Sequence, residues 1–321
     1  MSLSIVSFCR ESWSTMGEAY RNQVRLLLDV LPLVAEEQVF ALKGGTAINL
    51  FERDLPRLSV DIDLTYLPFD ERVMALDAIS TALQRIKVRI GKTVAWTRVT
   101  LVDQGGGLQA KLHCQRGRVQ IKIEVNATLR GHLMPTRIMA CSQRVQETFE
   151  AFVETPVVSH GELFGGKICA ALDRQHPRDL FDVHGLLETE GFGDDVKLGF
   201  LAALISHGRP INELLKPTVK DQRRVFGAQF AGMAFTDFGY DDHEATFARL
   251  LDAIGASLTA NDTAFLLSFK AVEPDWALFP LAGIDKLPAV QWKLDNLRRL
   301  KTDDPAKHAR SLKALEMVLA A

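Results

Sequence analysis

The sequence of 321 residues lacks the features of a membrane or disulfide-rich secreted protein. No apolar run approaches the roughly 18 residues that a membrane helix needs, and the longest candidates, such as 198–205, are short. The first ten residues contain no apolar stretch followed by a small-residue cleavage site, which argues against a signal peptide. The four cysteines form no CxxC pair and no metal-ligand spacing. We therefore expect a cytoplasmic protein with reduced thiols and no membrane association.

Internal repeats and low-complexity tracts are also absent. Hydrophobic residues make up 47% of the chain and charged residues 24%, which excludes disordered, collagen-like and coiled-coil proteins. The length is sufficient for two domains with a sizeable core.

The charge is unevenly distributed, although the formal net charge is only −2. Residues 80–145 hold twelve Lys or Arg against two acids, Asp103 and Glu124, a local charge of +10 that leaves −12 elsewhere. A basic block of this kind attracts phosphate, on a nucleotide or along an RNA backbone. The alternative is a solvated sheet face whose cations pair with acids from other parts of the chain.

Hydrophobic periodicity predicts a mixed α/β part followed by a helical part. The expected helices of the first part are 11–39, 46–53 and 69–90, and its expected strands are 40–43, 60–66, 93–102, 108–115 and 119–126. Turns at 105–107 and 115–117 predict that the last three strands form a meander. From residue 161 onward almost every segment is predicted to be helical. We expect an α+β protein with domains at 1–155 and 156–321, separated near Pro156.

The most informative stretch is a glycine pair followed by two acids. Gly44 and Gly45 stand where a predicted strand gives way to a helix, which lets backbone N–H groups approach phosphate oxygens without a Cβ in the way. Asp61 and Asp63 lie two residues apart on a predicted strand and therefore face the same side. Paired carboxylates suit a hard cation, typically Mg²⁺ carried in by a triphosphate.

Further charged side chains have two interpretations each. Glu124 completes a metal site or deprotonates an attacking hydroxyl, or only forms a salt bridge with one of the arginines around it. Lys167, on a predicted helix, meets triphosphate oxygens, or snorkels to solvent. Asp179 and Asp182 lie one turn apart on the same face of the next helix. Asp179 near the helix start suits the helix dipole, whereas Asp182, deeper in the helix, is not explained as a cap.

Four motifs carry a resemblance. In order, they are KGGTAINLF, RLSVDIDLTY, ELFGGKICAALDR and PRDLFDVHGL. Together they resemble the AbiEii/AbiGii nucleotidyltransferase toxin family, the toxin half of type IV toxin–antitoxin pairs, within the DNA polymerase β-like nucleotidyltransferase superfamily. The resemblance covers about residues 40–187 and implies a polymerase β-like core with a mixed sheet, followed by an all-helical domain. The fifteen residues between Gly45 and Asp61 exceed the shortest superfamily spacings but are usual for this branch.

The resemblance also implies roles for individual residues. Those expected at the site are Gly44, Gly45, Thr46 and Lys167 for nucleotide binding, Asp61 and Asp63 for metal binding, and Asp61, Asp63, Lys167 and Asp182 for catalysis. Asp182 is expected to position Lys167 or the nucleotide. Glu124 matches no family motif, so its role stays open. Apart from the resemblance, Ser59 lies two residues before Asp61 and is expected to point to the same face, where its phosphorylation would repel the incoming NTP.

The implied activity is Mg²⁺-dependent nucleotidyl transfer of the EC 2.7.7 type. Related toxins transfer NMP from an NTP, often a pyrimidine one, to the 3′ end of tRNA, which halts translation. The implied partners are an NTP, tRNA and an AbiEi-like antitoxin, and the implied setting is phage defence. Two alternatives remain open: transfer to a protein or small molecule, and a catalytically silent fold that binds RNA or a partner. The helices after Gly193 have no assigned role.

Overall fold

The computed structural model describes residues 17–103 and 109–320, which divide into two compact units. Cys9 and the expected turn at 105–107 lie outside the described residues, as does the start of the first expected helix. The first unit comprises 1–127, 136–158 and 227–238, and the second comprises 128–135, 159–226 and 239–321. The change from one unit to the other at 158/159 lies close to the expected boundary near Pro156, but two short segments cross it.

Hydrogen bonds explain both crossing segments. In the first unit, Leu58 N donates to Met233 O at 3.0 Å and Phe235 N donates to Pro56 O at 2.8 Å. In the second, the backbone N–H groups of Leu133 and Met134 donate to the carboxylate of Glu162. These bonds join segments far apart in sequence, so no local sequence pattern predicts them.

A seven-stranded mixed sheet forms the centre of the first unit, in the order β3-β4-β5-β2-β1-β7-β6. The β2–β5 and β1–β7 pairs are parallel and the other pairs are antiparallel. The strands are β1 (Phe40–Lys43), β2 (Asp61–Tyr66), β3 (Thr97–Val102), β4 (Lys111–Arg116), β5 (Val119–Val125), β6 (Arg137–Ala140) and β7 (Glu154–Val157). The α+β class with a mixed sheet is confirmed, whereas β6 and β7 are additions to the expected strands.

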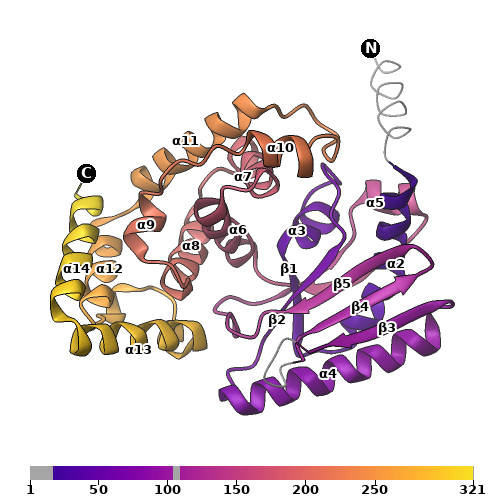
Figure 1. The fold of residues 1–321 in the computed structure, drawn as a ribbon, viewed down its shortest axis with the longest axis horizontal. Helices are drawn as coiled ribbons and strands as arrows, with labels where there is room; N and C mark the ends of the chain where they lie inside the picture. The colour runs from indigo at the N-terminus through magenta and orange to yellow at the C-terminus, as the bar shows by residue number, and fades with distance from the viewer. Residues whose placement is uncertain (1–16, 104–108, 321) are drawn as a thin grey trace. The chain divides into compact units, whose positions relative to one another are not determined.

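Helices α2 (Glu18–Ala35) and α4 (Arg72–Thr93) pack on one face of this sheet (Figure 1). Alternation along β2 explains the packing, because Ile62 and Leu64 are buried while Asp61 and Asp63 are partly exposed. The same alternation in β5 buries Ile121 and Ile123 and leaves Lys122 exposed. The remaining helices of this part are α3 (Gly44–Ala47), the π-helical turn η1 (Ile48–Glu52) and α5 (Gln143–Phe149).

The second unit is helical. Its helices are α6 (His160–Arg174), α7 (Pro177–Thr189), α8 (Asp194–Ser206), α9 (Ile211–Leu215), α11 (Tyr240–Ser257), α12 (Ala260–Lys270), η2 (Trp276–Leu278), η3 (Ile284–Lys286), α13 (Pro288–Asp303) and α14 (Pro305–Leu319). α10 (Arg223–Gln229) spans the change between units at residue 226. No helix among the described residues is both long enough and apolar enough to cross a membrane.

Glycines set the closest helix packing in this unit. A Cβ at Gly165 would collide with the backbone of Gly199, and one at Gly199 would collide with the backbone of Gly161. Helices α6 and α8 therefore approach each other backbone to backbone, which only glycine permits. By contrast, a Cβ at Gly166 would meet open space. This close contact fixes α6, the helix that carries Lys167.

Candidate active site

The glycine pair and the Asp61–Asp63 strand lie against each other in the first unit. α3 begins at Gly44, directly after β1, so the expected strand-to-helix junction is present. Gly44 has φ +74°, and a Cβ there would lie 2.6 Å from Asp63 Oδ2. A Cβ at Gly45 would lie 2.9 Å from both the Arg57 guanidinium and Ser59 Oγ. Gly44 therefore requires glycine, because of its positive φ and its approach to Asp63, whereas a side chain at Gly45 would have to displace those of Arg57 and Ser59.

Thr46 joins this turn to the strand that carries the acids. Its hydroxyl donates to Asp61 O at 2.5 Å and lies 3.1 Å from Ser59 Oγ, and its side chain is fully buried. The hydroxyl thus holds α3 against β2, and any contact of Thr46 with a nucleotide would have to come from its backbone. Ser59 is half-buried in the same wall of the turn.

One row of charged residues crosses the sheet at Asp63. The register pairs Lys43 of β1 with Asp63, Asp63 with Glu124 of β5, and Glu124 with Lys111 of β4. Residues opposite each other on neighbouring strands point to the same face. Asp61 is paired in the same way with Lys122. The sheet therefore gathers three carboxylates on one face, as the sequence predicts for Asp61 and Asp63.

The third carboxylate is engaged by a cation. Glu124 Oε2 forms a salt bridge with Lys111 Nζ at 2.8 Å. Among the described residues, no group of three or more His, Cys, Asp or Glu side chains is arranged to hold a metal ion. Glu124 thus forms a salt bridge, although its partner is a lysine rather than one of the arginines expected from the sequence.

Lys43 is the cation that lies opposite Asp63 in register. Burial lowers the pKa of Lys43, while Asp63 and Glu124 act in the opposite direction. Its charge balances the carboxylate row from the β1 side, as that of Lys111 does from the β4 side. The sequence gives Lys43 only as the residue before the glycine pair, and its place opposite Asp63 follows from the strand register.

Lys167 and Asp182 belong to the second unit, where they form a buried cluster. Lys167 Nζ lies 3.0 Å from Asp179 Oδ1 and 3.0 Å from Asp182 Oδ2. Arg174 adds Nε and Nη2 contacts of 2.5 and 2.9 Å to the two oxygens of Asp179. Asp179 and Asp182 therefore share one helical face, as their spacing predicts. Asp182 contacts Lys167 directly.

Local signals bring the two helices of this cluster together. α6 is capped by Ser159, whose hydroxyl accepts from Glu162 N, and it ends at Gln175 in the left-handed conformation with φ +53°. α7 then starts with His176 as its cap and Pro177 in its first turn. The reversal at Gln175 sets Lys167 of α6 against the first turns of α7.

The electrostatics of the cluster favour its charged form. Burial opposes ionisation of Asp179, but Lys167 and Arg174 outweigh it and hold the pKa of this carboxyl well below its usual range. Lys167 and Asp182 are 8% and 4% exposed, and Asp179 is 1% exposed. The snorkelling interpretation of Lys167 is therefore wrong, because its ammonium is held by two buried acids rather than by water.

A family model for the nucleotidyl transferase AbiEii toxin of type IV toxin–antitoxin systems matches residues 25–296. The chain belongs to this family. Among solved structures, MenT4, a nucleotidyltransferase toxin from Mycobacterium tuberculosis H37Rv, is similar with a TM-score of 0.57 and 16% sequence identity. The alignment covers 91% of this chain and 98% of MenT4, and it shows a shared fold. No curated protein sequence matches the chain.

The AbiEii match makes the chain a nucleotidyltransferase toxin of a type IV system, and the family implies an NTP substrate and an antitoxin partner. Three residues of the two clusters escaped the sequence-based prediction of function: Lys43, Arg57 and Arg174. Arg57 is 2% exposed and donates from Nη1 to Leu58 O at 2.8 Å. A signal for it exists, since it lies within the RLSVDIDLTY motif. Arg174 has the same kind of signal, as the last residue of the ELFGGKICAALDR motif, but its partner Asp179 lies across a turn and in another motif.

Much of the basic block is paired. Among the described residues, salt bridges engage Arg85, Arg89, Lys111, Arg116 and Arg137 of this block. Their partners are acids of other elements, apart from Glu124 of the block itself. Within the part of the chain that the structure describes, Arg98 and Lys122 are exposed and have no ion pair. Both are on the face of the sheet that carries Asp61 and Asp63.

Proposed function

We propose that this AbiEii toxin transfers NMP from an NTP to the 3′ end of an RNA, with tRNA as the acceptor, and so blocks translation. The observation that carries the proposal is the packing of Gly44 against Asp63, so close that a Cβ added at Gly44 would lie 2.6 Å from Asp63 Oδ2. A phosphate-binding turn and a carboxylate pair in contact are what nucleotidyl transfer needs, since metal and phosphates must be held together.

The donor set fits Mg²⁺. Asp61 and Asp63 supply two carboxylates on one strand face, and Mg²⁺ is commonly bound by one or two carboxylates together with substrate phosphates. Gly44 keeps the space beside Asp63 free of a side chain. When bound, the metal would neutralise phosphate charge and favour the deprotonated acceptor hydroxyl.

The chain's own residues then have distinct tasks. The backbone amides of Gly44 and Gly45 would donate to phosphate oxygens and stabilise the charge that develops on the leaving pyrophosphate. Lys167 is assigned a contact with the nucleotide, which the family membership supports. Asp182, 3.0 Å from Lys167 Nζ, would orient that ammonium. Lys43 would hold Asp63 in place through its opposite charge.

An RNA acceptor is supported by the exposed cations beside the acids. Arg98 and Lys122 share the face of the sheet with Asp61, and they have no ion pair among the described residues. Cations of this kind bind phosphates without reading sequence. His113 of β4 lies between them in register, opposite both Thr100 and Lys122.

Sequencing of RNA 3′ ends after expression tests reaction and acceptor together. We expect nucleotides added to tRNA 3′ ends by the wild type, and at least a thousandfold less by Asp61→Asn, since a catalytic carboxylate supplies several kcal/mol of transition-state stabilisation. Asp77→Asn, an exposed acid of α4 in the same unit, is the matched control and should retain activity. Label from radioactive NTP in protein or in a small molecule, with RNA ends unchanged, would contradict the assigned acceptor.

A glycine pair of variants tests the contact itself. Gly44 and Gly117 both have positive φ, +74° and +61°, so alanine strains the backbone at both. Only at Gly44 does the new Cβ meet Asp63, whereas at Gly117 it meets nothing within 4 Å. Gly44→Ala should therefore abolish transfer, while Gly117→Ala should lose stability only. Equal activity of the two variants would refute the contact as the basis of the site.

A further inference from the structure

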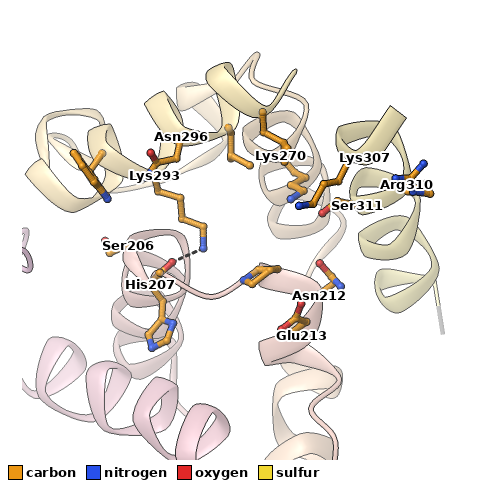
Figure 2. A pocket seen from close by; sticks show the side chains of 15 residues that line it. Ser206, His207, Asn212, Glu213, Lys270, Lys293, Asn296, Lys307, Arg310 and Ser311 are labelled. Carbon is orange, nitrogen blue, oxygen red and sulfur yellow. Dashed lines mark hydrogen bonds between the residues drawn. The ribbon is translucent and has the colours of Figure 1, made fainter. Parts of the chain in front are cut away.

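A cavity of about 560 Å³ lies within the helical unit (Figure 2). It is bounded by the end of α8, by α9, by the last residue of α12, and by α13 and α14. We call it the C-terminal cation cavity, because its lining includes Lys270, Lys293, Lys307 and Arg310. All its residues belong to the second unit, so it contains none of the glycines or acids of the candidate active site.

The charge of the lining is strongly positive. Glu213 is the only acid among the lining residues, against four cations. Its carboxylate is also shared with Arg209, whose Nε lies 3.3 Å from Glu213 Oε2. The lining therefore has a net charge of about +3, which raises the local concentration of anions.

Lys270 is the decisive residue. It is 4% exposed, yet within residues 17–103 and 109–320 its ammonium makes no hydrogen bond or salt bridge. Glu213 attracts it only through space, and burial lowers the pKa of Lys270. Lys270 lies in the last turn of α12, where the helix dipole favours a cation. This preference explains the charge at that position but not why the amine faces a cavity. The ammonium is not among the fully buried unpaired polar atoms, so it faces the cavity, where an anion from outside can reach it.

Lys293 shows how the same unit treats a lysine that needs no ligand. Its ammonium donates to His207 O at 2.5 Å and Arg209 O at 2.6 Å, and lies 3.5 Å from Leu204 O. Figure 2 shows this side chain reaching from α13 to the His207 carbonyl. Burial, together with the charge of Lys270, lowers the pKa of Lys293 to about 8. At neutral pH most Lys293 ammonium groups therefore remain charged, which adds to the field at Lys270.

The rim adds groups suited to a nucleotide. Trp292 lines the cavity and is 56% exposed, which offers an aromatic face for a base. Asn296 and Ser311 add neutral hydrogen-bonding groups, and Lys307 and Arg310 are exposed cations of α14. A multiply charged phosphate matches this set better than a single carboxylate, because it brings more charge and more acceptor oxygens.

We propose that the C-terminal cation cavity binds the phosphate group of a nucleotide unit, with Lys270 as the central ligand and Lys307 and Arg310 at the rim. The phosphate belongs to a free nucleotide or to an RNA strand, since both present the same chemistry. This site does not depend on the proposed nucleotidyl transfer, because none of its residues takes part in that reaction.

Equilibrium binding to the full-length protein in EDTA, where no transfer occurs, tests this site. The probes are inorganic phosphate, 5′-AMP and a 5′-phosphorylated RNA 10-mer. We expect binding that weakens at least tenfold in Lys270→Met and declines with added salt. Lys313→Met, an exposed lysine of α14 outside the cavity, is the matched control and should bind as the wild type does. Asp61→Asn should also bind normally, which separates this site from the proposed active site.

The outcomes distinguish the sources. Binding of 5′-AMP or phosphate that is sensitive to Lys270→Met assigns a free nucleotide, and binding of the RNA alone with the same sensitivity assigns a strand. If Lys270→Met fails to fold, Lys307→Met/Arg310→Met replaces it, because both of its side chains are exposed, and we expect a three- to tenfold loss. Equal binding by Lys270→Met and Lys313→Met, loss of binding in Asp61→Asn, or no binding of any probe would overturn the proposal.

Discussion

Two lysines of the helical unit are buried to a similar degree, but their surroundings differ. Lys167 lies 3.0 Å from each of two acids, Asp179 and Asp182. Lys270 has no hydrogen bond or salt bridge among the described residues. A buried charge with well-placed partners is internally compensated, whereas one without partners lowers stability. The comparison teaches that the charge of Lys167 is compensated by acids of the folded chain, whereas that of Lys270 faces a cavity that an outside anion can enter.

The largest effect should come from removing the compensated lysine. Lys167→Met leaves the Asp182 carboxylate buried without its cation, and such a loss costs about 3–5 kcal/mol. The free energy of unfolding, measured by urea denaturation at pH 7, should fall by about this amount.

A second variant separates charge compensation from packing. Lys167→Met/Asp182→Leu removes both partners, so it should recover much of the stability lost in the single variant, because no unpaired charge of this pair remains buried. Asp179 keeps Arg174 in both variants. If the single variant were as stable as the wild type, Lys167 would not be compensated in the way described.

Acid should affect the same cluster next. The depressed pKa of Asp179 means that its ion pairs contribute stability above the unfolded-state pKa near 4 and lose it as the pH falls further. Between pH 5 and pH 3, the unfolding free energy of the wild type should therefore drop more steeply than that of Asp179→Asn. Urea titrations at several pH values measure both slopes, and parallel slopes would contradict the assignment.

The sequence was sufficient for the parts of the site that are set by local pattern. Alternation along 60–66 places Asp61 and Asp63 on one face, and helical spacing places Asp179 and Asp182 on another. Both placements follow from the repeat of side-chain direction along a strand or a helix alone. The helix at 69–90 shows the limit, because Val73, an apolar residue of this segment, is 80% exposed. It lies in the first turn of α4, where little of the core reaches it.

Features set by long-range packing were not predictable in this way. Lys43 faces Asp63 because β1 and β2 pair in one register, and a shift of one residue would reverse the face. β6 and β7 are four residues each, too short for a clear period. The cavity around Lys270 joins segments from residues 206 to 311, so no stretch of sequence shows it. Such sites depend on how helices pack, which periodicity does not specify.

Alkaline pH should change the stability contributed by Lys293, a lysine of the C-terminal cation cavity. The pKa of Lys293 is about 8 in the folded chain, below the 10.5 of a free lysine. Between pH 8 and pH 10.5 the unfolded chain therefore binds more protons at this residue than the folded chain does. Charging Lys293 therefore costs stability below pH 8, and this cost disappears as the pH rises to about 10.5. The stability of the wild type relative to Lys293→Gln should increase from pH 7 to pH 10. A constant difference between the two would contradict the lowered pKa.

The smallest effect, and the only gain at neutral pH, is expected for Lys270→Met. Replacing an uncompensated buried ammonium by an apolar side chain of similar length should raise the unfolding free energy by about 1 kcal/mol. Inorganic phosphate should raise the melting temperature of the wild type but not that of this variant, because ligand binding stabilises only a protein that binds it. Destabilisation by Lys270→Met as large as that of Lys167→Met would show that both lysines are compensated within the fold and would remove the contrast between them.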